Sequence, residues 1–417
     1  MPDKKTVSAR MAARMTQGEG RIFLAGCASE PRAILEAVRQ EPDLWQGETL
    51  VGTFIPGVND QDFSAFGLNT TVESIFATKG LKPGATRGRL DLLPLHYSAQ
   101  WRYLATPGRV KVVYVEVPPP RSDGTVGLGV SADFAMAPIA AGARLVGVVN
   151  PRMPDPANGP TLPVDRFAAF VEDEHDLPIY DAGEIDPATA AIGTAIASLL
   201  APGDTLQLGL GKVQTAVLNA LCESGPTGLA FHAGMVSTPM LDALNSGVFS
   251  EGVTTGVALG DSRFYEEIAA RKDIRFAPVG YTHAQATFSS IERFISVNSV
   301  LEVDLHGQAN GEFLGGRQIS GHGGMVDFIR GAREARSGLS ILALPATGRD
   351  GTSSRIVARL GGGCPVTVAR SDIDLVITEF GTADLRHAST EERARRLIAV
   401  AAPSFRDALE HQWRQAA

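Results

Sequence analysis

Two glycine-rich segments hold residues whose types and spacing suit the binding of a charged ligand. The first, residues 206–213 (LQLGLGKV), ends a strand-like run and opens a helix-like one. Free backbone N–H groups and the helix dipole attract a phosphate at such a place. The segment lacks the third glycine of the dinucleotide fingerprint, and no Ser or Thr follows Lys212 as a Walker loop requires. A phosphate-binding turn and an ordinary tight turn therefore both remain open.

The second segment, residues 315–324 (GGRQISGHGG), has five glycines in ten residues. Ordering so many glycines costs much chain entropy. Such a loop is more typical of a place where a ligand approaches bare backbone than of a simple connector. A plain surface loop is the alternative.

Three side chains are candidates for proton transfer. A neutral imidazole with a pKa of about 6.5 can take a proton from water, which makes His232 and His322 candidate general bases. Glu312, shortly before the second glycine segment, is a third candidate. Each also has a structural interpretation: a core histidine, a loop histidine and a structural carboxylate. Ser131 and Asp133 follow a glycine-rich strand end, but no histidine lies nearby in the sequence to complete a serine triad.

The elements that must position these residues follow from the hydrophobic pattern. Apolar runs at residues 110–117, 144–149 and 339–344 alternate with helix-like stretches such as 390–399. This alternation predicts α/β architecture with buried parallel strands. Residues 21–38 and 204–221 each read as strand, glycine turn and helix, which favours two related halves.

Composition narrows the class of protein. Of 417 residues, 44% are hydrophobic and 20% are charged, which is a soluble globular balance. The formal net charge of −8 provides no basic field for nucleic acid or an anionic membrane. Three widely spaced cysteines indicate neither a disulfide framework nor a zinc ribbon. The charged N-terminus lacks the apolar core of a signal peptide, so we expect a cytoplasmic protein.

Several segments carry a likeness to one known family. They are residues 123–133 (DGTVGLGVSAD), 149–154 (VNPRMP), 295–308 (ISVNSVLEVDLHGQ), 317–331 (RQISGHGGMVDFIRG), 354–357 (SRIV) and 376–386 (VITEFGTADLR). With these segments the chain resembles the acetyl-CoA hydrolase/transferase family, which includes 4-hydroxybutyrate, butyrate and succinate CoA-transferases. The likeness extends over nearly the whole chain.

The resemblance implies an α/β protein of two related CoA-transferase-type domains with mainly parallel sheets and flanking helices. We expect an N-terminal domain over residues 1–185 and a C-terminal domain over residues 186–417. Coenzyme A would bind as acyl-CoA substrate or product, with no metal, and the chain would form a homo-oligomer, with a dimer as the first expectation. The implied CoA-binding residues are Gly209, Leu210, Gly211, Lys212, Val213, Ile319, Gly321 and Gly323.

The chain departs from the family at the residue that performs its chemistry. The family uses a glutamate in a His-Ser-Glu-Met motif, which attacks the thioester and becomes a glutamyl-CoA. The matching segment here is residues 229–236 (LAFHAGMV), which places Gly234 at the position of that glutamate. Glycine has no side chain to acylate, and no Asp or Glu follows until Asp242. A lysine that contacts CoA in relatives matches Leu339, and Lys212 either restores a positive charge or is an ordinary solvated lysine.

We therefore predict an enzyme that acts on a CoA thioester without a glutamyl-CoA intermediate. Water or an organic acceptor would attack directly, activated by His232, Glu312 or His322, with loop N–H groups stabilising the oxyanion. Two alternatives remain: a CoA-transferase with a relocated carboxylate, for which Glu312 is the best candidate, and a non-catalytic CoA-binding protein. The sequence does not identify the acyl group.

Overall fold

The computed structural model describes residues 5–416, and the chain divides into two compact units. The first extends to residue 181 and also includes residues 234–238 and 254–282. The second comprises residues 182–233, 239–253 and from 283 onward. The units therefore differ from the expected contiguous domains 1–185 and 186–417, because two later segments return to the first unit. Hydrogen bonds from Ala132 N to the carbonyl oxygen of Gly256 (2.9 Å) and from Ala258 N to that of Val130 (2.8 Å) join residues 254–282 to the first unit. Strand β12 (Met235–Ser237) joins it by pairing in parallel with β14 (Val257–Leu259).

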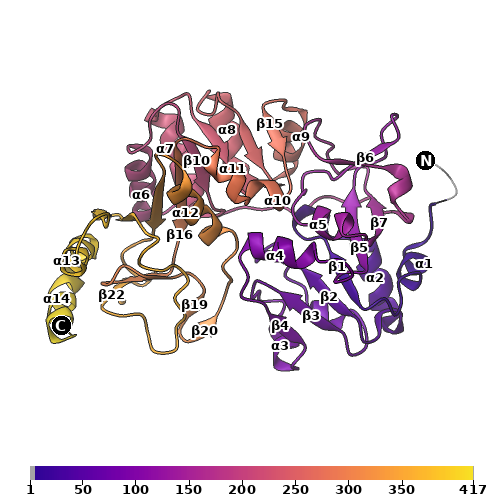
Figure 1. The fold of residues 1–417 in the computed structure, drawn as a ribbon, viewed down its shortest axis with the longest axis horizontal. Coiled ribbons are helices and arrows are strands. Elements are labelled where there is room, and N and C mark those ends of the chain that lie inside the picture. The colour runs from indigo at the N-terminus through magenta and orange to yellow at the C-terminus, as the bar shows by residue number, and fades with distance from the viewer. Residues whose placement is uncertain (1–4, 417) are drawn as a thin grey trace. The chain divides into compact units, whose positions relative to one another are not determined.

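The first unit is built on a seven-stranded parallel sheet (Figure 1). Its strand order is β4-β3-β2-β1-β5-β7-β9. The strands are β1 (Arg21–Leu24), β2 (Thr49–Gly52), β3 (Thr71–Ser74), β4 (Leu90–Leu92), β5 (Val112–Val117), β7 (Arg144–Val149) and β9 (Ala169–Glu172). Every residue of β5 is buried, as expected for a central parallel strand.

Short helices and strand pairs complete the first unit. They are α1 (Ala9–Arg14), α2 (Arg32–Gln40), α3 (Lys82–Thr86), α4 (Tyr97–Leu104), β6 (Thr125–Gly127), α5 (Met136–Ala140), β8 (Thr161–Pro163), α9 (Ser262–Ala270), β15 (Ile274–Phe276) and α10 (Val279–Thr282). The first-unit core joins Ile22, Leu50 and Val112 from the sheet with Ile34 and Val38 from α2.

In the second unit, strands β11, β10, β16, β21, β23 and β24 lie side by side in that order. Their bounds are β10 (Thr205–Leu208), β11 (Ala230–His232), β16 (Phe294–Ser299), β21 (Leu339–Ala343), β23 (Leu375–Thr378) and β24 (Gly381–Asp384). All of these pairings are parallel except that of β23 with the edge strand β24. The expectation of α/β architecture with mainly parallel sheets and flanking helices is confirmed.

Helices and small strands surround this second sheet. They are α6 (Pro187–Ala197), α7 (Lys212–Ser224), α8 (Pro239–Asn245), α11 (Gln285–Ser289), β17 (Glu302–Asp304), β18 (Ala309–Asn310), β19 (Phe313–Leu314), β20 (Arg317–Gln318), α12 (Met325–Glu334), β22 (Ile356–Val357), α13 (Thr390–Val400) and α14 (Arg406–Ala416); β13 (Val253–Thr255) spans a boundary of the units. Helix α12 packs on β16 and β21. The second glycine segment leads directly into α12, so this packing fixes the end of that segment relative to the sheet.

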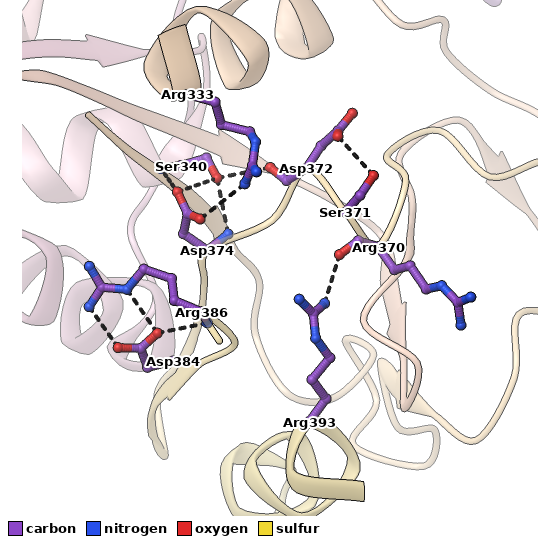
Figure 2. A network of polar contacts seen from close by, with 9 residues as sticks. All are labelled: Arg333, Ser340, Arg370, Ser371, Asp372, Asp374, Asp384, Arg386 and Arg393. Atoms are coloured by element: carbon purple, nitrogen blue, oxygen red, sulfur yellow. Dashed lines mark hydrogen bonds and ion pairs between the residues drawn. The ribbon is translucent and has the colours of Figure 1, made fainter. Parts of the chain in front are cut away.

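A polar network fixes the opposite end of α12 to the sheet (Figure 2). Asp374, just before β23, accepts hydrogen bonds from the backbone N (2.9 Å) and hydroxyl (3.1 Å) of Ser340 and pairs with Arg333 at 3.3 Å. Arg393 of α13 donates to the carbonyl oxygen of Arg370 at 2.7 Å. These contacts tie α12 and β21 to the residue before β23, and α13 to the loop that leads to it. Within residues 5–416, no helix has the length and apolar character needed to span a membrane.

Candidate active site

The first glycine segment lies at the carboxyl edge of the second-unit sheet, where parallel α/β sheets bind their ligands. Gly209 follows β10 directly and is exposed. Next to it, the buried side chain of Asn298 in β16 donates to Gln207 Oε1 (3.1 Å) and to Ser296 Oγ (2.9 Å). A Cβ atom at Gly209 would lie 3.8 Å from Asn298 Oδ1. A buried polar cluster therefore supports this loop from below.

Gly211 connects the loop to helix α7. It is the N-cap residue, and its φ of +121° is a conformation that side-chain-bearing residues rarely adopt. No side chain caps this end of α7, so the first-turn N–H groups of Lys212 and Val213 can meet a ligand. Lys212 is exposed, whereas Leu210 and Val213 are half-buried.

Lys212 also has an acidic neighbour. The pKa of Asp186, the N-cap residue of α6, lies below its usual value mainly because the carboxylate accepts the backbone N–H of Thr189; the positive charge of Lys212 contributes. The charge of Lys212 thus acts on the starts of both helices, α6 and α7.

The second glycine segment has two parts: a hairpin turn and a stretch that leads into α12. Gly315 and Gly316, with φ of +57° and +74°, form the two-residue turn of the β19–β20 hairpin. The remaining part leads into α12, with Gly321 and Gly323 buried and Ile319 exposed. Only this second part remains a candidate for ligand contact, since the first two glycines are explained by the turn.

Gly324 allows a close approach of a histidine to the start of α12. A Cβ atom there would overlap the ring of His283, whose Cδ2 would lie 2.7 Å away. The buried His283 ring also packs on Phe328 at a centroid distance of 4.4 Å. Burial, with a smaller effect of His232, holds the pKa of His283 well below its usual value, so the ring is neutral near pH 7.

His232 lies at the end of β11 among aromatic rings. It is 4% exposed, and its ring packs edge-to-face against Phe288 and Phe294 at 6.1 and 6.0 Å. Phe288, Phe294 and Phe328 form a buried aromatic cluster that both His232 and His283 contact. These contacts agree with the core-histidine interpretation of His232.

Glu312 and His322, which the sequence separates by the glycine segment, meet in the structure. Glu312 is 3% exposed, and its Oε1 lies 3.5 Å from Nδ1 of His322. Its Oε2 accepts a hydrogen bond from the hydroxyl of Thr367 at 2.8 Å. The backbone carbonyl of Glu312 accepts from the N–H of Ile319 at 2.8 Å, which ties the loop to the same residue. A carboxylate that orients an imidazole is an arrangement used for general base catalysis.

The charge of this region also affects a cysteine. Burial and the carboxylates of Glu302 and Glu312 raise the pKa of the Cys364 thiol. Cys364 is therefore a neutral thiol near pH 7 and a poor nucleophile. The thiolate chemistry of a cysteine hydrolase is not favoured at this position.

Gly234 belongs to the first unit. Its carbonyl oxygen accepts two backbone hydrogen bonds, from Gly256 and Val257, both at 3.0 Å. It stands directly before β12, and the chain offers no acidic side chain at this point. The assignment of Gly234 to the family's glutamate position remains a prediction from the motif.

Sequence reasoning missed two polar residues that support the candidate site. Asn298 interrupts an apolar strand, and a buried amide in such a strand is the signal that could have found it. Thr367 contacts Glu312 across 55 residues of sequence and gave no comparable signal, because it follows a glycine turn and precedes a single buried valine.

Comparison with known proteins agrees with this architecture. Residues 3–175 match the acetyl-CoA hydrolase/transferase N-terminal domain, and residues 260–413 match the acetyl-CoA hydrolase/transferase C-terminal domain. Together these matches account for most of both units.

Individual relatives extend over the same length. The chain is 29% identical to 4-hydroxybutyrate coenzyme A transferase of Clostridium kluyveri, covering 99% of this chain and 98% of the relative. It is 32% identical to succinyl-CoA:cyclohexane-1-carboxylate CoA transferase of Geobacter metallireducens, covering 81% and 79%. The crystal structure of RipA from Yersinia pestis superposes with a TM-score of 0.92 at 26% identity, covering 99% and 98%. Both domain matches and these relatives agree with the parallel-sheet units described above. They show that the chain belongs to the acetyl-CoA hydrolase/transferase family.

Proposed function

We propose that this enzyme cleaves or transfers an acyl-CoA thioester by direct attack of water or an organic acceptor, without a glutamyl-CoA intermediate. The observation that carries the proposal is the pairing of buried Glu312 with His322 in the loop that leads to α12. The family supports an acyl-CoA substrate. The glycine at position 234 favours a route in which no side chain holds the acyl group.

In the proposed reaction, Nε2 of His322 takes a proton from water as the water oxygen bonds to the thioester carbon. Backbone N–H groups of the second glycine segment would stabilise the oxyanion. The tetrahedral intermediate then expels the CoA thiolate, which takes the proton back from the imidazolium. The products are a carboxylic acid and free CoA; with an acceptor in place of water, the acyl group passes to the acceptor.

The contacts of Glu312 favour an orienting role over a nucleophilic one. Both carboxylate oxygens already face partners, Thr367 and His322, and the side chain is buried. A nucleophile must reach the thioester carbon, and a displacement of about 1 Å already costs about 10²-fold in rate. The relocated-carboxylate alternative is tested by intact mass after incubation with acyl-CoA and hydroxylamine. A trapped adduct on Glu312 would replace the present proposal.

The main experiment measures release of free CoA thiol from a panel of acyl-CoAs, with and without acetate. The native chain should release thiol, and His322→Gln and Glu312→Gln should each lower kcat by about 10²-fold or more. His411→Gln, at an exposed position in α14, is the matched control and should keep the native rate. No turnover by the native chain, with CoA still bound, would support the non-catalytic alternative.

The CoA contacts, the absence of a metal, the compartment and the oligomeric state are further parts of the proposal, which we predict from the likeness to the family. We propose that residues Gly209–Val213 and the segment Ile319–Gly323 contact CoA and that no metal takes part. We also propose that the chain acts as a cytoplasmic homodimer without nucleic acid partners. Activity that survives exhaustive chelation, and the mass in solution, test the metal and dimer predictions.

A further inference from the structure

We propose that Thr367 is a positioning residue that directs the Glu312 carboxylate toward His322 and so fixes the imidazole tautomer with its proton on Nδ1. This inference rests on the proposed function, because it gives the Glu312–His322 pair a defined protonation geometry. It concerns contacts of this chain's own residues, which can be measured apart from catalysis.

The hydrogen bonds of Thr367 determine which way its hydroxyl points. Its Oγ1 accepts the backbone N–H of Gly311 at 2.9 Å and lies 2.8 Å from Glu312 Oε2. A hydroxyl has one proton, and an ionised carboxylate can only accept. The proton of Thr367 is therefore committed to Glu312. Thr367 is 6% exposed, so water competes little for this bond.

The backbone on both sides of this bond is also held. Thr367 N donates to the carbonyl oxygen of Ala309 at 2.9 Å, and Ala309 forms a bridge with Val368. On the other side, Asn310 Oδ1 accepts the backbone N–H groups of Glu312 (3.0 Å) and Phe313 (2.9 Å). Neither end of the Thr367–Glu312 contact can shift easily without breaking these bonds.

Asn310 is itself anchored. Its Nδ2 donates to Glu302 Oε2 at 3.0 Å and to the carbonyl of Phe313 at 2.8 Å. The buried amide thus uses both its acceptor and its donor group to shape the turn that carries Glu312. A network of hydrogen bonds from Glu302 in β17 through Asn310 to Thr367 therefore positions the Glu312 carboxylate.

With Oε2 held by Thr367, Oε1 is the oxygen that faces His322 Nδ1. A carboxylate next to a neutral imidazole favours the tautomer whose proton lies on the facing nitrogen. Nε2 then keeps its lone pair and can accept a proton from the attacking water. Without the Thr367 bond, the carboxylate could rotate and the preference between the two tautomers would weaken.

The test compares Thr367→Val, which removes the hydroxyl, with Thr367→Ser, which keeps it. Thr352→Val, at an exposed position, is the matched control for loss of a threonine hydroxyl. Nitrogen-15 NMR of histidine-labelled full-length protein reports the His322 tautomer, with the signal assigned by His322→Gln. Native protein and Thr367→Ser should show the proton on Nδ1, and Thr367→Val should show a mixture.

Kinetics give the second measurement. Thr367→Val should lower kcat by about 10- to 100-fold with little change in KM, and Thr367→Ser should recover most of the rate. A Thr367→Val protein that is folded and keeps the native tautomer overturns the inference, whatever its rate. A changed tautomer with an unchanged rate, together with a fully active His322→Gln, leaves Thr367 as the positioning residue but refutes His322 as the base of the proposed function.

Discussion

At the scale of single residues, the proposed mechanism depends on the prediction that Gly234 stands at the position of the family's glutamate. A glutamate there would offer a carboxylate that can hold an acyl group and then CoA, whereas glycine offers only backbone. The Gly234 carbonyl accepts hydrogen bonds from two backbone N–H groups, so the backbone at this position is held in place. In the proposed function, the chain keeps the family's fold and departs from the family's mechanism at this one residue.

Gly234→Glu tests this separation. If the surroundings still suit the family reaction, the variant should exchange CoA between acyl-CoA and acetate at least about tenfold faster than the native chain, with ping-pong kinetics. Intact mass should show a glutamyl-CoA adduct. Gly234→Gln is the matched control, since an amide of the same size cannot form it. A folded glutamate variant without exchange would show that the surroundings of residue 234 no longer suit the family reaction.

A second residue-scale prediction concerns Asp133 in the first unit. Burial raises its pKa from 3.8 to about 7. Between these values the folded state binds a proton that the unfolded state has lost, so the free energy of unfolding falls as pH rises from about 4 to 7. The slope from this group is at most about 1.4 kcal/mol per pH unit.

Asp133→Asn should remove that slope. The variant should match the native chain near pH 4 and be more stable near pH 8, as measured by urea unfolding at both pH values. Asp91→Asn, at an exposed aspartate, is the control and should leave the pH dependence unchanged. An equal effect of Asp133→Asn at pH 4 and pH 8 would contradict the assigned cause.

At the scale of elements, Gly324 and His283 determine how α12 begins. A methyl group at position 324 would overlap the His283 ring and come within 3.2 Å of Phe328. Overpacking of this kind costs about 1–3 kcal/mol. Gly324→Ala should therefore destabilise the second unit, and adding His283→Ala should recover part of the loss.

A double-mutant cycle measures this coupling. We expect at least about 1 kcal/mol between Gly324→Ala and His283→Ala, against less than about 0.5 kcal/mol between Gly316→Ala and His283→Ala. Gly316 is a suitable control because a Cβ atom there meets nothing within 4 Å. Strictly additive effects for the first pair would show that the His283 ring moves away at no cost.

The same elements show what the sequence could predict. The run at residues 144–149 coincides with β7, and the run at 339–344 with β21 (Leu339–Ala343), because buried parallel strands are nearly continuous in apolar residues. The glycine count at residues 315–324 did not reveal that two of its glycines belong to a hairpin turn. Both a turn and a ligand loop select glycine, so composition alone does not separate them.

The contacts between side chains of the candidate site were harder to predict from the sequence than the strands. Glu312 and His322 were identified as separate candidates, but their contact depends on how the hairpin folds back. The contact of Thr367 with Glu312 depends on pairing across 55 residues, which leaves no local pattern. Local periodicity predicts elements well, while polar contacts between distant segments require the tertiary fold.

At the scale of the whole molecule, the return of residues 234–238 and 254–282 to the first unit was not predictable from two echoed strand–turn–helix motifs. The units have separate cores, one around Ile22 and Leu50 and another around Leu342 and Val376. A ligand that binds only the folded chain stabilises it by mass action, so the shift in the thermal midpoint measures binding to the folded state.

CoA should therefore raise the thermal midpoint of the native chain, by an amount that grows with CoA concentration. At 100 times the dissociation constant, the gain is about 2.7 kcal/mol. Gly211→Val should abolish most of this shift, because a branched residue at a φ of +121° distorts the turn whose N–H groups would meet the phosphate. Gly351→Val imposes a similar backbone strain, at a φ of +70° in an exposed loop, and should keep the full shift while lowering the midpoint without ligand. Equal CoA shifts in both variants would place the phosphate contacts away from the start of α7.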